Sequence, residues 1–421
     1  MRNRMRGWAR VLVVLVLLGA GTTQCARGPG GRPVVEVDAP TALVDRAVHM
    51  RIGGLTAGEK VGVDLRAVDV EGKPWRGHAT FRANSHGVVD VDTAAPLSGT
   101  YRRPDGMGLF WSMNPRSGDP EQAYFRPPYR GKSGFDLTLT ATANGRRPVS
   151  RTLTRKWTEA GVSARDLTLA ADAVVGSLFL PAAATPRRPA VLVFGGSEGG
   201  PGPAADAALF AAHGYPALAL GYFHAPGLPD TLANIPLEYF RAAVRILAGQ
   251  PGVDPDHIVA QGYSRGSEAA LLLAQHYPDV VHGAIVYSPS DMANGGFPNF
   301  GQPAWTKDGR ALAGGHIRLD HVAGPVLAIA GADDRLWPSA DAARAIVKEL
   351  DDRGNPHPHR ALVFPDAGHG VGTFPYLAAG TRYTHPLTNE VLDVGGTRAA
   401  NAAAQEQGWP QVLALLASLT R

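Results

Sequence analysis

Cysteine is almost missing from this chain, which has one, Cys25, among 421 residues. A single thiol excludes an intrachain disulfide framework and any zinc or iron–sulfur site that needs several cysteines. The histidines, aspartates and glutamates show no recognisable metal-ligand spacing either. We therefore expect no metal and no other cofactor.

An excess of charge of either sign is also missing. The chain holds 41 Lys and Arg against 37 Asp and Glu, and Arg2, Arg4, Arg6 and Arg10 lie in an N-terminus without acidic residues. The rest of the chain is therefore neutral and offers no basic face for nucleic acid. With 44% hydrophobic residues the chain is too apolar to be disordered, and its length suggests two or three domains.

Long hydrophobic runs are absent as well, because the N-terminal run Val11–Leu18 is too short to span a bilayer comfortably. Arginines precede this run and small residues follow it, so residues 1–32 are predicted to be a signal segment and the protein to be exported. Cys25 stands where a bacterial lipoprotein would be lipidated and anchored to a membrane, although the residues before it match a lipoprotein box poorly. A chance cysteine in a discarded leader is the alternative, and without a functional signal the protein would be cytoplasmic.

Residues 33–156 show short alternating segments separated by Gly, Pro, Asn and Asp, without a helical period. This pattern is typical of a β-sandwich. The expected strands are Val34–Val37, Ala47–Ile52, Lys60–Val68, His78–Ala83, Val88–Val91 and Phe135–Ala141. The stretch around Thr154 is interpreted as either a linker or the last strand of the sandwich.

Residues 162–421 have a different sequence pattern, in which short apolar strands alternate with Ala-rich helical stretches. Such alternation predicts a mainly parallel sheet with helices on both faces. The expected strands are Ala190–Phe194, Ala217–Leu220, Ile258–Gln261, Ala284–Tyr287, Val326–Ala330 and Ala361–Phe364. The expected helices are Ala204–His213, Leu237–Ala248, Glu268–His276 and Ala340–Leu350. Because ligands bind beyond the carboxyl ends of parallel strands, polar residues that follow these strands are candidate functional residues.

The sequence Gly262-Tyr263-Ser264-Arg265-Gly266 joins an expected strand directly to an expected helix. This is the pattern of a nucleophile elbow, in which a serine sits on a sharp strand-to-helix turn. The same G-x-S-x-G pattern recurs around Ser197, but the Gly- and Pro-rich stretch after it cannot continue as a helix. We therefore expect Ser264 to be the nucleophile.

The loop around Ser197 is suited to a second role. In serine hydrolases of this type, the backbone N–H after the nucleophile and an N–H from an earlier strand-to-helix loop hold the oxyanion. We expect these donors to be Arg265 and Ser197, with Glu198 as the neighbouring alternative to Ser197. A phosphate-binding turn or a merely tight glycine turn is the other interpretation of this loop.

A serine nucleophile needs a histidine base and a carboxylate that orients it, and each is expected just after a strand, in the order Ser, acid, His. Asp333 and Asp334 follow one expected strand, and His369 follows the next. We favour Asp334 as the acid, with Asp333 as the alternative, and His369 as the base. Histidines without such a context are His276, His282, His316, His321, His357, His359 and His385.

Further motifs make the chain similar to a known family. They are Ser98–Tyr101, Asp105–Met113, Ala211–Tyr215, Leu228-Pro229, Ile235–Phe240, Tyr287–Ser290, Trp305-Thr306, Trp337–Ser339 and Ala367–His369. Over nearly everything after residue 33, the chain resembles the acyl-CoA thioester hydrolases and bile acid-CoA:amino acid N-acyltransferases. The resemblance implies an immunoglobulin-like β-sandwich over residues 33–156 and an α/β-hydrolase domain over residues 162–421. It also implies the triad Ser264, Asp334 and His369.

The activity implied by the resemblance is hydrolysis of a small-molecule acyl thioester or ester through an acyl-serine intermediate. Members that transfer acyl groups to amino acids look to use Cys at the elbow, and the ester of Ser264 is less prone to aminolysis, so hydrolysis is expected. Coenzyme A is intracellular, so the export signal leaves the carrier open. The alternatives are an exported esterase, an N-acyltransferase or a catalytically idle binding protein. Asn294–His316 is interpreted as either a cap over an acyl pocket or a surface insertion.

Overall fold

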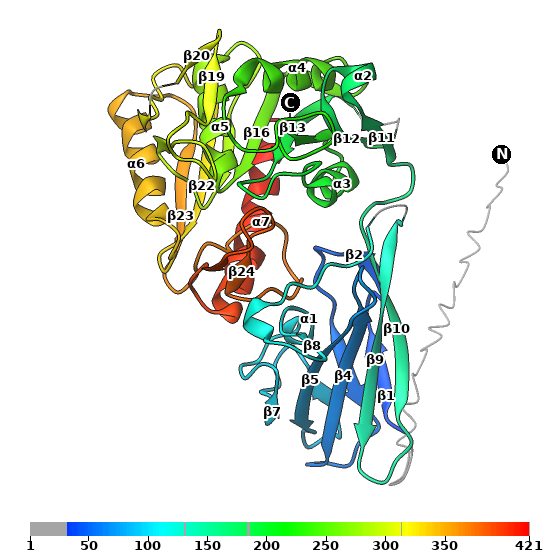
Figure 1. The fold of residues 1–421 in the computed structure, drawn as a ribbon. Coiled ribbons are helices and arrows are strands. Elements are labelled where there is room, and N and C mark those ends of the chain that lie inside the picture. The colour runs from blue at the N-terminus through cyan, green and yellow to red at the C-terminus, as the bar shows by residue number, and fades with distance from the viewer. Residues whose placement is uncertain (1–31, 130–131, 183–185, 313, 421) are drawn as a thin grey trace, which may run out of the picture.

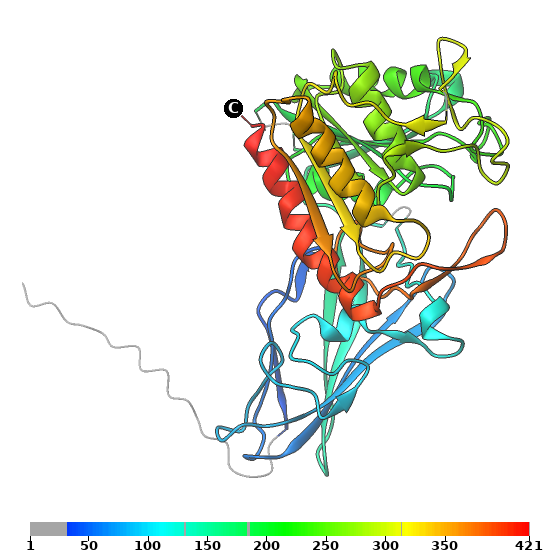
Figure 2. The same cartoon turned by 90° about the vertical axis from the view of Figure 1, so that its left-hand side faces the viewer.

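The computed structural model describes residues 32–129, 132–182, 186–312 and 314–420, and the expected signal segment with Cys25 falls outside them except for Arg32. Figures 1 and 2 show two parts of the chain, a β-rich N-terminal domain below and an α/β domain above. The N-terminal end of helix α7 and the segment that holds β24 lie at the boundary between the two parts, and α7 then runs along the α/β domain to the C-terminus.

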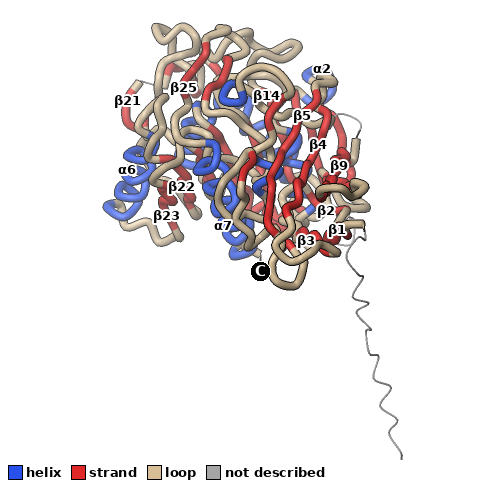
Figure 3. The backbone as a smooth tube through the Cα atoms, turned by 90° about the horizontal axis from the view of Figure 1, so that it is seen from below, coloured by secondary structure: helices blue, strands red, loops and turns tan. Residues whose placement is uncertain are grey.

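The N-terminal domain consists of two sheets packed face to face. One has the strand order β1-β3-β6, and the other has the order β2-β10-β9-β4-β5-β7 with β8 paired to β5. Figure 3 shows these strands from below. The strands are β1 Val34–Val37, β2 Thr41–Leu43, β3 Met50–Gly53, β4 Lys60–Val68, β5 Pro74–Arg82, β6 Val89–Asp90, β7 Ser98–Gly99, β8 Asn114–Pro115, β9 Gly134–Ala143 and β10 Val149–Lys156; the helices are α1 Gly108–Trp111 and the 3₁₀ turn η1 Pro120–Gln122.

Alternation of side chains explains why this domain forms a sandwich. Along β4, Val61, Val63 and Leu65 are buried, while the residues between them are partly or fully exposed. Each strand therefore presents one apolar face to the opposite sheet. The stretch around Thr154, for which a linker was the alternative, is part of β10, which pairs with β9 over its full length.

The C-terminal domain is built on an eight-stranded sheet with the order β11-β12-β14-β13-β16-β17-β22-β23. Strand β12 runs antiparallel to both of its neighbours, and the later pairs are parallel. The strands are β11 Ser163–Leu167, β12 Val175–Leu180, β13 Arg188–Phe194, β14 Ala217–Gly221, β16 Val253–Tyr263, β17 Ala284–Tyr287, β22 Val326–Gly331 and β23 His359–Phe364. The predicted α/β-hydrolase fold is confirmed.

Helices cover both faces of this sheet. They are α2 Leu169–Asp172, α3 Ala204–Ala212, α4 Leu237–Ala248, α5 Arg265–His276, α6 Ser339–Asp352 and α7 Arg398–Ser418. Buried residues of α4, α5 and α6 share one apolar core with one face of the central strands, and those of α3 and α7 share another with the opposite face. In the described part of the chain, no helix is long and apolar enough to cross a membrane.

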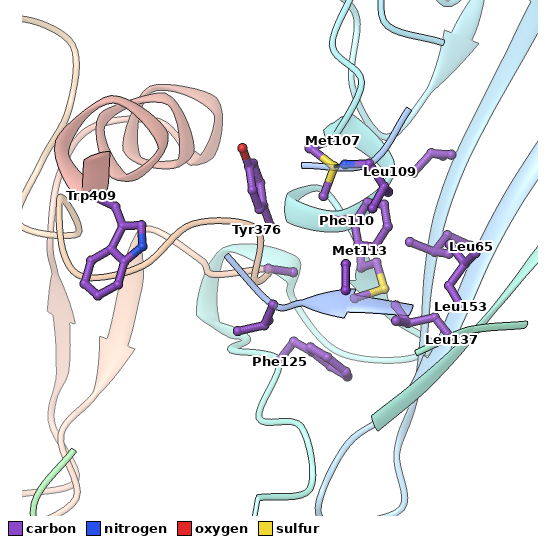
Figure 4. Close-up of a cluster of buried hydrophobic side chains, with 14 of the residues drawn as sticks. Leu65, Met107, Leu109, Phe110, Met113, Phe125, Leu137, Leu153, Tyr376 and Trp409 are labelled. Atoms are coloured by element: carbon purple, nitrogen blue, oxygen red, sulfur yellow. Dashed lines mark hydrogen bonds between the residues drawn. The ribbon is translucent and has the colours of Figure 1, made fainter. Parts of the chain in front are cut away.

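The α3 and α7 face continues into the core of the N-terminal domain. Figure 4 draws side chains of this shared core, with Tyr376 and Trp409 from the C-terminal domain and Leu65, Phe110 and Leu137 from the sandwich. Because apolar surface of the two domains is buried together, their relative position is part of the folded state.

Polar contacts also join the two domains. Asp45 accepts hydrogen bonds from Nε2 of His213 at 2.6 Å and Nε1 of Trp409 at 2.7 Å. Arg398, at the start of α7, donates to Oδ1 of Asn114 and to the carbonyl oxygen of Met113, both at 2.7 Å. These charge-assisted bonds fix the orientation of the sandwich against α7.

Short strands lie outside these three sheets: β15 Ile235–Pro236, β18 Met292–Ala293, β19 Trp305–Lys307, β20 Arg310–Ala311, β21 Gly315–His316, β24 Arg382–Thr384 and β25 Val391–Asp393. Of these, β24 and β25 form a hairpin. Strand β15 pairs with β19 beside α4.

Candidate active site

The turn at Ser264 is a strained strand-to-helix elbow. Ser264 follows β16 directly, precedes α5, and has φ 54° and ψ −121°, a backbone conformation that costs a non-glycine residue free energy. A Cβ at Gly262 would run into the carbonyl oxygen of Gly266, and a Cβ at Gly266 into that of Gly195. The glycines of the motif are therefore required by the close approach of three backbone segments.

The structure brings Ser264, His369 and Asp334 into one hydrogen-bonded chain. Oγ of Ser264 lies 2.9 Å from Nε2 of His369, and Nδ1 of His369 lies 2.8 Å from Oδ2 of Asp334. The three side chains come from the ends of β16, β22 and β23, and all are buried. This arrangement can move a proton from the serine hydroxyl to the imidazole, with the carboxylate holding the tautomer that has its proton on Nδ1.

Several neighbours hold the imidazole of His369 in place. The hydroxyls of Tyr263 and Ser288 both donate to its carbonyl oxygen at 2.7 Å. The rings of Tyr263 and Trp337 meet the imidazole edge-on, with centroids 5.4 and 5.5 Å away. The base is therefore oriented by its backbone and by its ring faces as well as by Asp334.

The two adjacent aspartates have different surroundings. Asp334 faces His369, and its Oδ1 accepts from the backbone N–H of Leu336 at 2.9 Å. The side chain of Asp333 is 45% exposed and points the other way, to the backbone N–H of Gly396 and to Arg335. The structure thus places Asp334, and not the alternative Asp333, against the histidine.

The loop after β13 lies directly against the elbow. A Cβ added to Gly196 would stand 2.9 Å from Cβ of Ser264. Both carboxylate oxygens of Glu198 accept from the N–H of Gly196 at 2.9 Å. The N–H of Ser197 donates to no acceptor among the described residues, and the N–H of Arg265 belongs to the first turn of α5, where no intrahelical acceptor exists.

Glu198 is a carboxylate beside the nucleophile that sequence reasoning considered only for its backbone. Burial raises the pKa of Glu198, and the N–H groups of Gly196 and of Glu198 itself oppose that rise. Its carboxylate lies where side chains at Gly195 and Gly196 would be. Because Gly195 and Gly196 have no side chains, the carboxylate of Glu198 fits against this loop.

The side chain of Arg265 is buried below the elbow and does not reach toward Ser264. Its Nε donates to Glu268 at 2.6 Å, and its guanidinium also donates to the carbonyl oxygen of Gly295 at 2.6 Å. Glu268 in turn accepts from Asn294 and from Nε1 of Trp305. This satisfied buried pair anchors the first turn of α5 to the 294–316 segment.

A cavity of about 300 Å³ opens at Ser264. It is lined by Tyr124, Ser197, Glu198, Tyr263, Ser264, Leu336, His369, Gly370, Gly372, Ala379, Gly380, Tyr383, His385, Leu392, Val394, Asn401 and Gln405. The segment with β24 and β25 and Tyr124 of the N-terminal domain thus wall the cavity, and none of the described residues of Asn294–His316 lines it. A larger groove, of about 1240 Å³, lies along Arg66, Arg76 and Arg116 on the N-terminal domain. It contains none of Ser264, His369 and Asp334.

Among the cavity residues, Tyr124 was not considered from the sequence, and His385 was set aside as a histidine without a functional context. The rings of Tyr124 and Tyr383 meet edge-on at 5.6 Å, and the backbone of Phe125 donates to Ala378 at 2.8 Å. No local pattern marks Tyr124, because its place depends on the docking of the two domains. His385 follows a short hairpin strand instead of a strand of the main sheet, so its context in the sequence gave no signal.

Comparison with known proteins relates both domains to one family. Residues 45–168 match the acyl-CoA thioester hydrolase/BAAT N-terminal region, and residues 235–309 and 307–420 match the BAAT/acyl-CoA thioester hydrolase C terminal. BAAT denotes the bile acid-CoA:amino acid N-acyltransferases.

Relatives and solved structures extend this comparison. The chain is 27% identical to human acyl-coenzyme A thioesterase 6, over 87% of this chain and 92% of that protein. It is also 27% identical to mouse peroxisomal succinyl-coenzyme A thioesterase, over 88% and 92%. A puromycin-hydrolyzing peptidase of Mycobacterium tuberculosis has 16% identity and a TM-score of 0.44, over 84% of this chain and 53% of that one. This chain belongs to the acyl-CoA thioester hydrolase/bile acid-CoA:amino acid N-acyltransferase family.

Proposed function

We propose that this protein is a serine hydrolase that cleaves acyl thioesters through an acyl-Ser264 intermediate. The observation that carries the proposal is the hydrogen-bonded chain from Ser264 through His369 to Asp334, beside a cavity at the carboxyl edge of the sheet. Membership of the family and the thioesterase relatives support thioester hydrolysis as the reaction class.

The first half of the proposed reaction acylates the serine. His369 takes the hydroxyl proton as Ser264 attacks the acyl carbonyl carbon, and the carbonyl oxygen becomes an oxyanion. The N–H groups of Arg265 and Ser197 stabilise that oxyanion. The carbon–sulfur bond then breaks, and the leaving thiolate receives the proton from His369.

The second half releases the acid. His369 removes a proton from water as the water attacks the acyl-Ser264 ester, and it then returns the proton to the serine oxygen. Water is the favoured acceptor because an oxygen ester is less readily attacked by amines than a thioester is. Hydrolysis is therefore proposed instead of transfer to an amino acid.

The substrate is proposed to be a small acyl thioester, with an acyl-CoA as the first candidate because the relatives are coenzyme A thioesterases. An oxygen ester is the alternative if the protein is exported, as we propose from its N-terminal sequence. Fractionation of the native host, with this protein followed by an antibody, tests that location.

Labelling with a fluorophosphonate tests the nucleophile. The wild-type protein should be labelled once, at Ser264, and Ser264→Ala should be neither labelled nor active on acyl-CoA and p-nitrophenyl ester substrates. Ser418→Ala, a change at an exposed serine of α7, is the matched control and should behave as the wild type. Labelling that persists in Ser264→Ala, or turnover equal to the wild type, would overturn the proposal. Product that shifts from free acid to amide when glycine or taurine is added would instead indicate an acyltransferase.

A further inference from the structure

A second histidine–serine contact lies inside the same cavity. His385, which follows β24 and is 1% exposed, has its Nε2 3.1 Å from Oγ of Ser197. Ser197 belongs to the loop after β13, and both residues line the cavity at Ser264. The contact joins residues 188 positions apart in the chain, so the docking of the hairpin on this loop creates it.

The hydrogen bonds of His385 determine which ring nitrogen carries the proton. The backbone N–H of Leu387 points at Nδ1 from 3.2 Å. A backbone N–H can only donate, so Nδ1 is the acceptor and the proton of the neutral ring is on Nε2. Burial lowers the pKa of His385, which favours the same neutral form.

This tautomer decides what the Ser197 hydroxyl can do. The Nε2–H of His385 donates to Ser197, where Oγ lies 3.1 Å from Nε2 and the backbone is a second hydrogen-bond partner of the ring. The hydroxyl proton of Ser197 is then free to point elsewhere. Among the described residues no acceptor is in reach of this hydroxyl other than the ring nitrogen that already donates to it. The proton is therefore available to a group inside the cavity.

The loop that holds Ser197 lies against the nucleophile, and Ser197 and Ser264 line the same cavity. Gly196 lies against Cβ of Ser264, and Glu198 binds the Gly196 N–H, so the residue between them is held at the elbow. The ring of His385 is itself fixed by Phe297 and Tyr383, with centroids 4.7 and 6.0 Å away. The donor is thus pre-oriented before a substrate enters, as effective transition-state stabilisation requires.

We propose that the Ser197 hydroxyl donates a hydrogen bond to the oxyanion formed when Ser264 attacks, and that His385 is the positioning residue that aims it. The inference rests on the proposed function and adds a side-chain donor to the backbone donors named there. A donor that already accepts a hydrogen bond is polarised, so the His385–Ser197 pair is a stronger donor than an isolated hydroxyl.

The first test separates the hydroxyl from the backbone. Ser197→Ala keeps the backbone N–H and should lower kcat for an acyl thioester by about 10²–10³-fold, the cost of one oxyanion donor, with KM nearly unchanged. Ser197→Thr keeps a hydroxyl and should recover most of that loss. Affinity for a trifluoromethyl ketone, which forms a tetrahedral adduct with serine, should fall in Ser197→Ala by the same factor as kcat/KM.

The second test concerns His385. His385→Phe keeps a ring but removes the donor and should lower kcat about 10-fold or more, whereas His385→Gln, with an N–H of similar reach, should retain more activity. A purely structural role would lower the melting temperature in both variants without this difference in kcat. The extent of fluorophosphonate labelling once the reaction is complete gives the folded, active fraction of every variant, and the rates are divided by this fraction.

Two outcomes would overturn the inference. One is a Ser197→Ala enzyme with kcat and trifluoromethyl ketone affinity within threefold of the wild type. The other is a Ser197→Thr enzyme that is no better than Ser197→Ala after normalisation. Failure of the proposed function is distinguishable, because in that case the wild-type protein would show no labelling at Ser264 at all.

Discussion

Asp206, in the first turn of α3, is expected to make the stability of the protein depend on pH. Its side chain is buried, 6% of the residue is exposed, and its Oδ1 has no hydrogen-bond partner among the described residues. Burial raises the pKa of Asp206 from its usual 3.8 to about 6, while a hydrogen bond from Thr373 opposes the rise. The folded protein therefore binds a proton on this carboxyl more tightly than the unfolded chain does.

The size and sign follow from proton linkage. A pKa difference of about two units between the folded and unfolded states corresponds to about 3 kcal/mol. This contribution to the free energy of unfolding is fully present below the unfolded pKa and is lost as the pH rises from about 4 to about 6. Asp206→Asn is uncharged at every pH. Its stability relative to the wild type should therefore increase by up to about 3 kcal/mol between pH 4 and pH 7.

Urea unfolding followed by circular dichroism at pH 4, 5, 6, 7 and 8 measures this difference. The control is Asp341→Asn, the same change at an exposed aspartate in the first turn of α6, which carries no cost of burial. The stability difference between Asp206→Asn and wild type should change with pH, and that of the control should change much less. A difference for Asp206→Asn that stays constant across this range would refute the reasoning.

Three further results are expected. Asp334→Asn should lower kcat by about 10⁴-fold, because the imidazole would lose the acceptor that holds its tautomer, while Asp333→Asn should change kcat only a few-fold. Steady-state turnover of a p-nitrophenyl ester measures both variants, and equal losses of kcat would contradict the assignment of Asp334. Gly262→Ala should abolish fluorophosphonate labelling, because its Cβ meets a carbonyl oxygen across the elbow, while Gly53→Ala, with open space around the new Cβ, should label normally. Asp45→Ala should lower the free energy of unfolding by about 1–3 kcal/mol, because Trp409 and His213 of the other domain lose their hydrogen-bond acceptor. An unchanged urea midpoint would show that this contact does not hold the domains together.

Much of the fold can be predicted from local sequence patterns. Period-two alternation marks strands such as β4, and continuous apolar runs such as Val326–Gly331 mark strands buried on both faces. The expected helices at α3 to α6 lie within a few residues of the observed ones. Elements without such a signal were not predicted, among them β12 and α7, whose interior holds Pro410, a residue that usually ends a helix.

The candidate site was likewise predictable in part from the sequence. Ser264, Asp334 and His369 could be nominated because each follows a strand, and the carboxyl ends of parallel strands meet at one edge. Asp334 was favoured, but position alone left Asp333 as an alternative, because adjacent residues at a strand end point in different directions only once the following loop is folded.

Local sequence was enough to predict the order of the elements, the glycine-flanked elbow and the chemistry of the residues at the strand ends, because these depend on side-chain periodicity and on steric limits within a few residues. The groups that surround the nucleophile are set by the folded arrangement of the whole chain. Tyr124 reaches the cavity from the N-terminal domain, and His385 contacts Ser197 from a hairpin far along the chain. Such contacts arise from the packing of distant segments, for which no short stretch of sequence carries a signal.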